Sequence, residues 1–384
     1  MPKKTYILLI AQFLSAFADN AILFTVIAMV MQASDKASWY IPALQSSFLI
    51  AYVVLAPWMG SFADHHPKAR VLIIANLIKA AGAVLLLLNI EPLIAYCLVG
   101  VGAALYSPAK YGILPELVGH DYLVKANSWI EGSTILAILL GMVVGAKVAD
   151  YSTQWALIGT IVLFLISAWI AGYLPLQQPK KAASGSKILA FGQQMGSFFT
   201  TPRSRFAILG GSLFWASAAT LRLIIVAWAP AVLMLKSASD IAQLTLYLAI
   251  GIIVGSAVVP RLIPLEHLRR ARIAAYLMAI LIAVLSLTTS IWPARAVLFV
   301  IGMMGGIFIV PINAVLQELG QHSIGSGSAV SLQNFFQNLA MLLAVGGYTY
   351  AASLQVSPVM TLVAVGGLVF VATFAVALKL PKSQ

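Results

Sequence analysis

Two ionisable side chains, Asp19 and Arg222, lie near the middle of long apolar runs. A charge at bilayer depth is costly, so one that persists usually faces a cavity or a partner and marks a transport pathway. Asp19 shares one helical face with Gln12 and Ser15, and Arg222 ends a similar stripe that begins at Ser212. The two could form a structural ion pair, but their depth favours a role in binding a substrate or coupling its movement to an ion.

Three further charges fall inside apolar runs. Lys110 and Glu131 each lie a few residues from a predicted cytoplasmic end, where snorkelling or mutual pairing competes with contact to a ligand. Lys79 lies in the middle of its run and receives no role from the sequence.

A loop rich in glycine and charge, from Gly60 to Arg70, joins the second and third apolar runs. Gly60 permits two helices to approach closely, and Asp64 can accept hydrogen bonds from a helix N-terminus, whereas Lys68 and Arg70 are expected at the cytoplasmic surface. The segment Ser323-Ile-Gly-Ser-Gly-Ser is typical of a helix start whose positive dipole end suits Asp64. We hypothesise a gate latch here; the alternative is a turn that carries a solvated charge.

The apolar runs that position these charges dominate the composition. Of 384 residues only 9% are charged, whereas soluble domains spend about a quarter of their residues that way. At about 20 residues for each helical span, the length accommodates twelve, and we predict an all-α polytopic membrane protein. The predicted spans lie near 6–31, 39–63, 70–89, 93–115, 125–150, 153–174, 205–236, 240–264, 271–290, 294–318, 325–353 and 358–380.

The basic residues are distributed unevenly between the two sides. With a cytoplasmic N-terminus, 16 Lys and Arg fall on the cytoplasmic side and 4 on the outer side, which predicts that both termini are cytoplasmic. This topology accounts for the net charge of +12 without a nucleic-acid partner. The single cysteine, Cys97, cannot form an internal disulfide or a thiolate cluster, and no metal or cofactor is predicted.

An internal repeat divides the chain. A shift of 202 residues places Glu116 on Glu318 and, within the same frame, Asn20 on Arg222. Two six-span halves of the same topology are typical of secondary transporters with a site near the midplane between the halves. We therefore predict three parts: an N-terminal six-helix bundle over 1–174, a cytoplasmic linker over 175–204 and a C-terminal six-helix bundle over 205–384.

The segment Gly60-x-x-x-Asp64 with Lys68 and Arg70 resembles a loop signature of the major facilitator superfamily. Longer stretches resemble the bacterial lysophospholipid transporter family, LplT, nearly from end to end. The clearest are Ala11-Gln-Phe-Leu-Ser-Ala-Phe-Ala-Asp-Asn20, Tyr106-Ser-Pro-Ala-Lys-Tyr-Gly-Ile-Leu114 and Thr220-Leu-Arg222.

The resemblance implies movement of lysophospholipids, chiefly lysophosphatidylethanolamine, from the outer to the inner leaflet of the bacterial cytoplasmic membrane by alternating access. A bifunctional acyltransferase/acyl-carrier-protein synthetase would reacylate them there. The headgroup would offer phosphate to Arg222 or Lys110 and ammonium to Asp19 or Glu131, with Asn20 beside them. We expect a monomer surrounded by membrane lipids, and we expect Asp19→Asn and Arg222→Ala to reduce transport with folding largely intact.

Two other functions compete with this interpretation. A proton-coupled drug or small-solute antiporter of the same fold, with Asp19 as the proton carrier, is the alternative. A membrane-embedded acyltransferase or lipase is not supported, because the sequence contains no H-x-x-x-x-D, G-x-S-x-G, H-E-x-x-H or P-loop motif. We therefore expect a transporter and not an enzyme.

Overall fold

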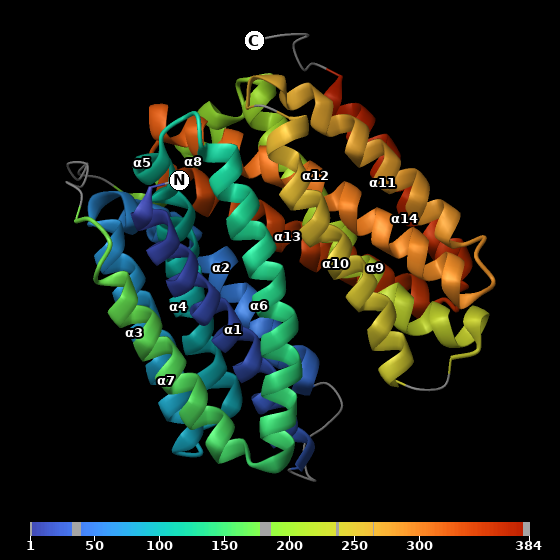
Figure 1. Ribbon diagram of the computed structural model, residues 1–384, viewed down its shortest axis with the longest axis horizontal. Helices are drawn as coiled ribbons and strands as arrows, with labels where there is room; N and C mark the ends of the chain where they lie inside the picture. Colours follow the sequence, from blue (N-terminus) through green and yellow to red (C-terminus); the bar gives the residue numbers. More distant parts are fainter. Residues whose placement is uncertain (1, 33–39, 177–185, 236–237, 264, 379–384) are drawn as a thin grey trace. The chain divides into compact units, whose positions relative to one another are not determined.

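The computed structural model describes residues 2–32, 40–176, 186–235, 238–263 and 265–378, and within these ranges the chain is helical and contains no strand (Figure 1). The elements are α1 (Lys3–Gln32), α2 (Tyr40–His65), α3 (Lys68–Leu87), α4 (Pro92–Gly112), α5 (Leu114–Val118), α6 (Leu123–Tyr151), α7 (Thr153–Ala171), α8 (Lys187–Phe198), α9 (Pro202–Leu233), α10 (Ala238–Leu262), the 3-10 helix η1 (Leu265–Arg270), α11 (Ala271–Leu285), α12 (Ile291–His322), α13 (Ser326–Ser353) and α14 (Pro358–Ala377). Six basic residues counted for the orientation lie outside the described residues, namely Lys36, Lys180, Lys181, Lys236, Lys379 and Lys382.

Each of the twelve predicted spans corresponds to one of the long helices, and α5 and α8 are additional. In the described part of the chain, ten helices are long and apolar enough to cross a membrane. The other two are α11, which has 15 residues, and α13, whose first half carries several amide side chains. Helix α11 ends before the predicted 290 because the hydroxyls of Ser286 and Thr288 donate to carbonyls of its last turn.

The chain forms two compact units. Unit 1 contains 1–126, 133–195 and 317–335, and unit 2 contains 127–132, 196–316 and 336–384. These units differ from the predicted bundles 1–174 and 205–384, because the segment 317–335 clusters with the N-terminal helices. The predicted linker, 175–204, contains the helix α8, while 177–185 lie outside the described residues. The division into two six-helix repeats stays a prediction.

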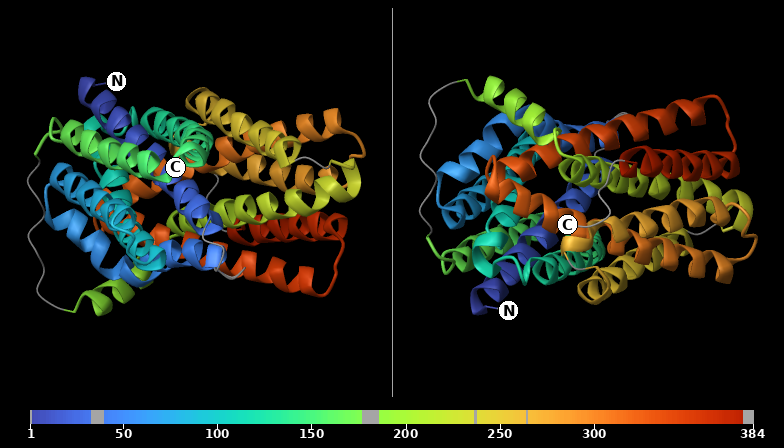
Figure 2. Two further views of the ribbon diagram at one scale, coloured as in Figure 1. Left: turned by 90° about the horizontal axis from the view of Figure 1, so that it is seen from below. Right: turned by 90° about the horizontal axis from the view of Figure 1, so that it is seen from above.

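Unit 1 is held together by contacts of α3 with α4 and α7, of α2 with α4, and of α1 with α7. In unit 2, α14 packs against α11 and α9, and α10 also contacts α9. Figure 2 shows the helices of each unit from two further sides.

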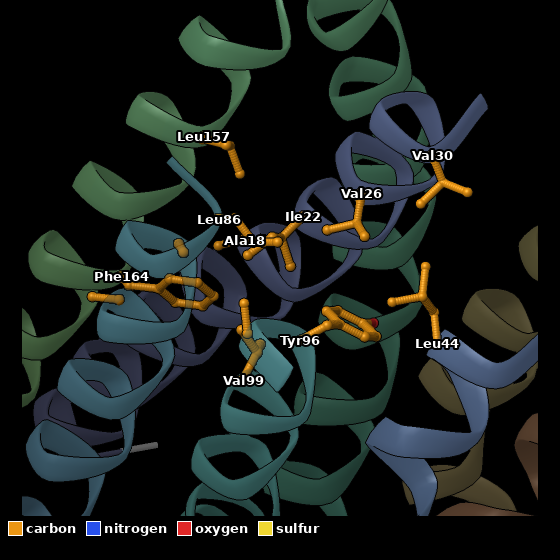
Figure 3. Packing of buried hydrophobic residues seen from close by; sticks show 13 residues of the cluster. Ala18, Ile22, Val26, Val30, Leu44, Leu86, Tyr96, Val99, Leu157 and Phe164 are labelled. Atoms are coloured by element: carbon orange, nitrogen blue, oxygen red, sulfur yellow. The ribbon is translucent and has the colours of Figure 1, made fainter. Parts of the chain in front are cut away.

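A cluster of buried hydrophobic residues joins α1, α2, α3, α4 and α7 of unit 1 (Figure 3). Its buried members are Ala18, Ile22, Val26, Val30, Leu44, Ala80, Ala83, Leu86, Ala95, Tyr96, Val99, Leu157 and Phe164. Ala18 precedes Asp19 in α1 and Ala80 follows Lys79 in α3, so the packed cluster fixes the backbone beside both charged residues.

Candidate functional site

Asp19 and Lys79 form an ion pair inside unit 1. The Lys79 ammonium, carried by α3, donates to Oδ2 of Asp19 on α1 across 2.6 Å. The Lys79 side chain is 1% exposed and the Asp19 side chain 21% exposed. The other carboxylate oxygen, Oδ1, is a buried atom and has no hydrogen-bond partner among the described residues. Lys79 therefore occupies only one of the two carboxylate oxygens of Asp19.

The Lys79 ammonium is enclosed on several sides. It donates to the Ser15 hydroxyl at 3.0 Å and lies 4.5 Å from the ring centroid of Tyr106 and 5.5 Å from that of Phe164. Aromatic faces attract a cation through their quadrupole, so the rings stabilise the charge. A Cβ on Gly102 would lie 2.6 Å from Cγ of Lys79, which shows how closely α4 packs on the lysine stem. Lys79 is consequently held in place.

A chain of hydrogen bonds continues from this pair through three helices. The Ser15 hydroxyl on α1 donates to the side-chain oxygen Oδ1 of Asn76 at 2.8 Å. The side-chain Nδ2 of Asn76 donates to the Ser167 hydroxyl on α7 at 2.9 Å. Ser167 in turn donates to the Ala11 carbonyl at 2.6 Å. Ser15 belongs to the predicted polar stripe of α1, whereas Asn76 and Ser167 were not predicted. The three-residue spacing of Asn76 and Lys79, which places both on one face of α3, was the available signal.

Asn20 and Gln12 make contacts that fix α1. The Asn20 amide donates to the Ala16 carbonyl of its own helix at 2.8 Å. Gln12 bonds α6 twice, by donating to the Ser133 hydroxyl and by accepting from the Thr134 hydroxyl at 3.1 Å. Gln12 therefore links α1 to α6, whereas the hydrogen bond of Asn20 stays within α1.

Two glycines of α6 bring that helix against α1. A Cβ on Gly141 would lie 3.1 Å from Cβ of Asn20, and one on Gly145 would lie 2.5 Å from Cα of Ala21. Tight packing therefore explains these two glycines in this structure.

The remaining predicted headgroup residues lie in different surroundings. Lys110, 8% exposed on α4 of unit 1, places its ammonium 4.2 Å from the Tyr111 ring centroid. In unit 2, Glu131 is 2% exposed and accepts a 2.8 Å hydrogen bond from the Asn313 amide, while Arg222 is exposed on α9. The convergence of all five predicted residues, including the opposition of Asp19 and Arg222, stays a prediction.

Asp64, at the end of α2, caps the start of α13 within unit 1. Its two carboxylate oxygens accept from the backbone N–H groups of Gly327 and Ser328 at 2.9 and 2.8 Å. Asp64 is 5% exposed, so the carboxylate is not a solvated charge in a turn. We call this arrangement the α13 latch; the expected contact is confirmed, and its gating role stays a prediction.

The latch requires close approach of the two helices. A Cβ on Gly60 would lie 2.7 Å from both Cα of Ser328 and Cβ of Ser331. The Ser331 hydroxyl donates to the Ala56 carbonyl at 2.7 Å. The absence of a side chain at position 60 therefore allows α13 to rest on α2, as the sequence analysis expected.

The expectation for Lys68 was wrong, whereas Arg70 is exposed as predicted. The Lys68 side chain is 10% exposed because it lies between two carboxylates. Its ammonium is 2.6 Å from Oε1 of Glu116 and 3.9 Å from Oδ1 of Asp64. Lys68 is thus buried beside the latch, where it joins Asp64 to Glu116.

Sequence comparisons place the chain in a family. A family model of the Major Facilitator Superfamily matches residues 8–345. The lysophospholipid transporter LplT of Photorhabdus laumondii is 40% identical over 364 residues, which cover 94% of this chain and 91% of the relative. The LplT of a Klebsiella pneumoniae strain is 41% identical over 379 residues, covering 96% and 92%.

Solved structures agree on the fold. The Escherichia coli fucose:proton symporter FucP matches with a TM-score of 0.78 at 13% identity and covers 97% of both chains. The human organic anion transporter MFSD10 matches with a TM-score of 0.79 at 13% identity, covering 98% of this chain and all of the other. The chain therefore belongs to the major facilitator superfamily and, within it, to the LplT family. Its apolar helices and its family make it a multi-pass membrane protein.

Proposed function

We propose that this protein carries lysophospholipids, chiefly lysophosphatidylethanolamine, from the outer to the inner leaflet of the bacterial cytoplasmic membrane by alternating access. The names of the relatives at 40% and 41% identity support the substrate class and favour it over drugs or small solutes. The chain works as a monomer with both termini in the cytoplasm, and it supplies lysophospholipid to a bifunctional acyltransferase/acyl-carrier-protein synthetase for reacylation.

The exposure and hydrogen bonding of the Asp19 carboxylate support the proposal most directly. The Asp19 side chain as a whole is 21% exposed within an apolar bundle, and its Oδ1, which is a buried atom, has no hydrogen-bond partner among the described residues. A carboxylate in that position can accept a charge-assisted hydrogen bond from the headgroup ammonium. Arg222 or Lys110 would bind the phosphate, since guanidinium and ammonium groups both donate to phosphate oxygens. Glu131 and Asn20 complete the proposed headgroup site.

The α13 latch supplies the gate in this proposal. Gly60, Asp64, Lys68 and Arg70 belong to the segment that ends α2 and begins α3, and Asp64 accepts from two amides of α13. Opening the cytoplasmic side requires those two hydrogen bonds to break.

Uptake of labelled lysophosphatidylethanolamine into spheroplasts tests the proposal. Cells that contain the protein should accumulate the lipid in the inner leaflet faster than cells that lack it, and Arg222→Ala should reduce the difference. In cells without the acyltransferase, the recovered lipid should be chemically unchanged, because a transporter forms and breaks no covalent bond in its substrate. Equal uptake with and without the protein would exclude the proposed function.

A further inference from the structure

We propose that Lys79 sets the headgroup selectivity of the site by neutralising Asp19 from a position that the lipid cannot reach. This inference rests on the proposed function. With Lys79 in place, the site presents a neutral ion pair and accepts lysophospholipids of net negative charge as well as zwitterionic ones. Lys79 is thus a positioning residue that acts only through the Asp19 carboxylate.

The side chains of Asp19 and Lys79 differ in how much of their surface is exposed. The Asp19 side chain is 21% exposed, whereas that of Lys79 is 1% exposed. A ligand can therefore approach the exposed part of the Asp19 side chain, although not its buried Oδ1, and it cannot approach the ammonium of Lys79. Lys79 also lacks space to follow a ligand, because Gly102 packs on its stem and Tyr106 and Phe164 flank its ammonium.

Charge explains why such a fixed cation matters. Opposite charges 2.6 Å apart act on a third group as a dipole, whose field falls off faster with distance than that of a lone carboxylate. Without Lys79, the Asp19 carboxylate would repel a headgroup that carries a phosphate charge and no ammonium. The same bare carboxylate would still attract the ammonium of an ethanolamine headgroup.

The test compares two lysolipids with the same labelled acyl chain, one with an ethanolamine and one with a glycerol headgroup. Transport of both is measured for the parent, Lys79→Met, the double variant Asp19→Asn/Lys79→Met and the control Lys147→Met, which removes an exposed lysine of α6. Lys79→Met should lower the glycerol-to-ethanolamine transport ratio on the order of tenfold. The double variant should restore the ratio to the parent's value or above it, because no uncompensated carboxylate remains.

A purely structural role for Lys79 would slow both lipids alike and leave their ratio unchanged, and that result would overturn the inference. A double variant with the same low ratio as Lys79→Met would also overturn it, since the effect would then not pass through Asp19. If Lys79→Met fails to accumulate in the membrane, the double variant alone tests the inference. A glycerol-to-ethanolamine transport ratio of the double variant below that of the parent would then contradict it. If the parent moves neither lipid, the proposed function fails instead.

Discussion

Two aspartates of unit 1 are neutralised in different ways. Asp64 satisfies both carboxylate oxygens with backbone N–H groups of α13, and its nearest cation, Lys68, is 3.9 Å away. Asp19 satisfies one oxygen by a direct ion pair with Lys79 and leaves the other without a partner among the described residues. Asp64 is also the more deeply buried of the two.

The difference indicates which carboxylate can serve a ligand. A carboxylate held by two backbone amides is released only when the helix that carries those amides moves. The unpaired Oδ1 of Asp19 is itself buried, but the side chain as a whole is 21% exposed, and a carboxylate held by one side-chain donor keeps lone pairs for a further donor. We therefore propose that Asp64 takes part in the conformational change and that Asp19 contacts the substrate.

Asp19→Asn should have the largest effect. It leaves the Lys79 ammonium buried without a counter-ion, which typically costs about 3–5 kcal/mol. The partial exposure of Asp19 favours the lower end of that range. Arg222→Ala, at an exposed position, should change the stability by less than about 1 kcal/mol. Transport should fall in both variants, and thermal unfolding in detergent should separate them.

Equal unfolding temperatures for these two variants would mean that the ion pair does not stabilise unit 1. This expectation also revises the one drawn from the sequence, in which both variants fold normally.

The helices could be predicted from the sequence, but the ion pair of Lys79 could not. The twelve helical runs were predictable because apolar length is a local property, and the contact of Asp64 with α13 was predictable from helix-start composition. The partner of Lys79 was not, because an ion pair between α1 and α3 depends on helix rotation and packing that periodicity does not fix. Lys68 was misplaced for the same reason, since its burial depends on Glu116, 48 residues away.

Gly60→Val should have the next largest effect, because it separates α13 from α2 by steric conflict. The first added carbon would already lie 2.7 Å from Ser328 and Ser331, and overpacking of this kind typically costs about 1–3 kcal/mol. We expect transport to fall by more than about tenfold. Gly159→Val is the matched control, since a Cβ there meets no atom within 4 Å. Equal transport by the two variants would show that close approach at the latch is not required.

Asp64→Asn should weaken the latch without steric conflict. An asparagine offers one oxygen, so its NH₂ group would face one of the two backbone donors and leave that donor unpaired, at a cost of about 1–3 kcal/mol. Alkylation of a cysteine placed at Ser331, which is 2% exposed, should then accelerate roughly 5- to 150-fold in a Cys97→Ser background. Arg70→Gln, which removes an exposed charge from the same loop, should leave the rate unchanged. An unaltered rate in Asp64→Asn would remove Asp64 from the gate.

Glu116→Gln should have the smallest effect, and it tests whether backbone amides or side-chain ion pairs hold the latch. Glu116 pairs with Lys68 at 2.6 Å, but its side chain is 21% exposed, and ion pairs near the surface are typically worth up to about 1 kcal/mol. Lys68 would keep Asp64 as its second carboxylate, so alkylation at position 331 and lipid transport should stay within about twofold of the parent. If Glu116→Gln opened the latch as far as Asp64→Asn, the ion pair of Lys68, and not the amides of α13, would hold the latch closed.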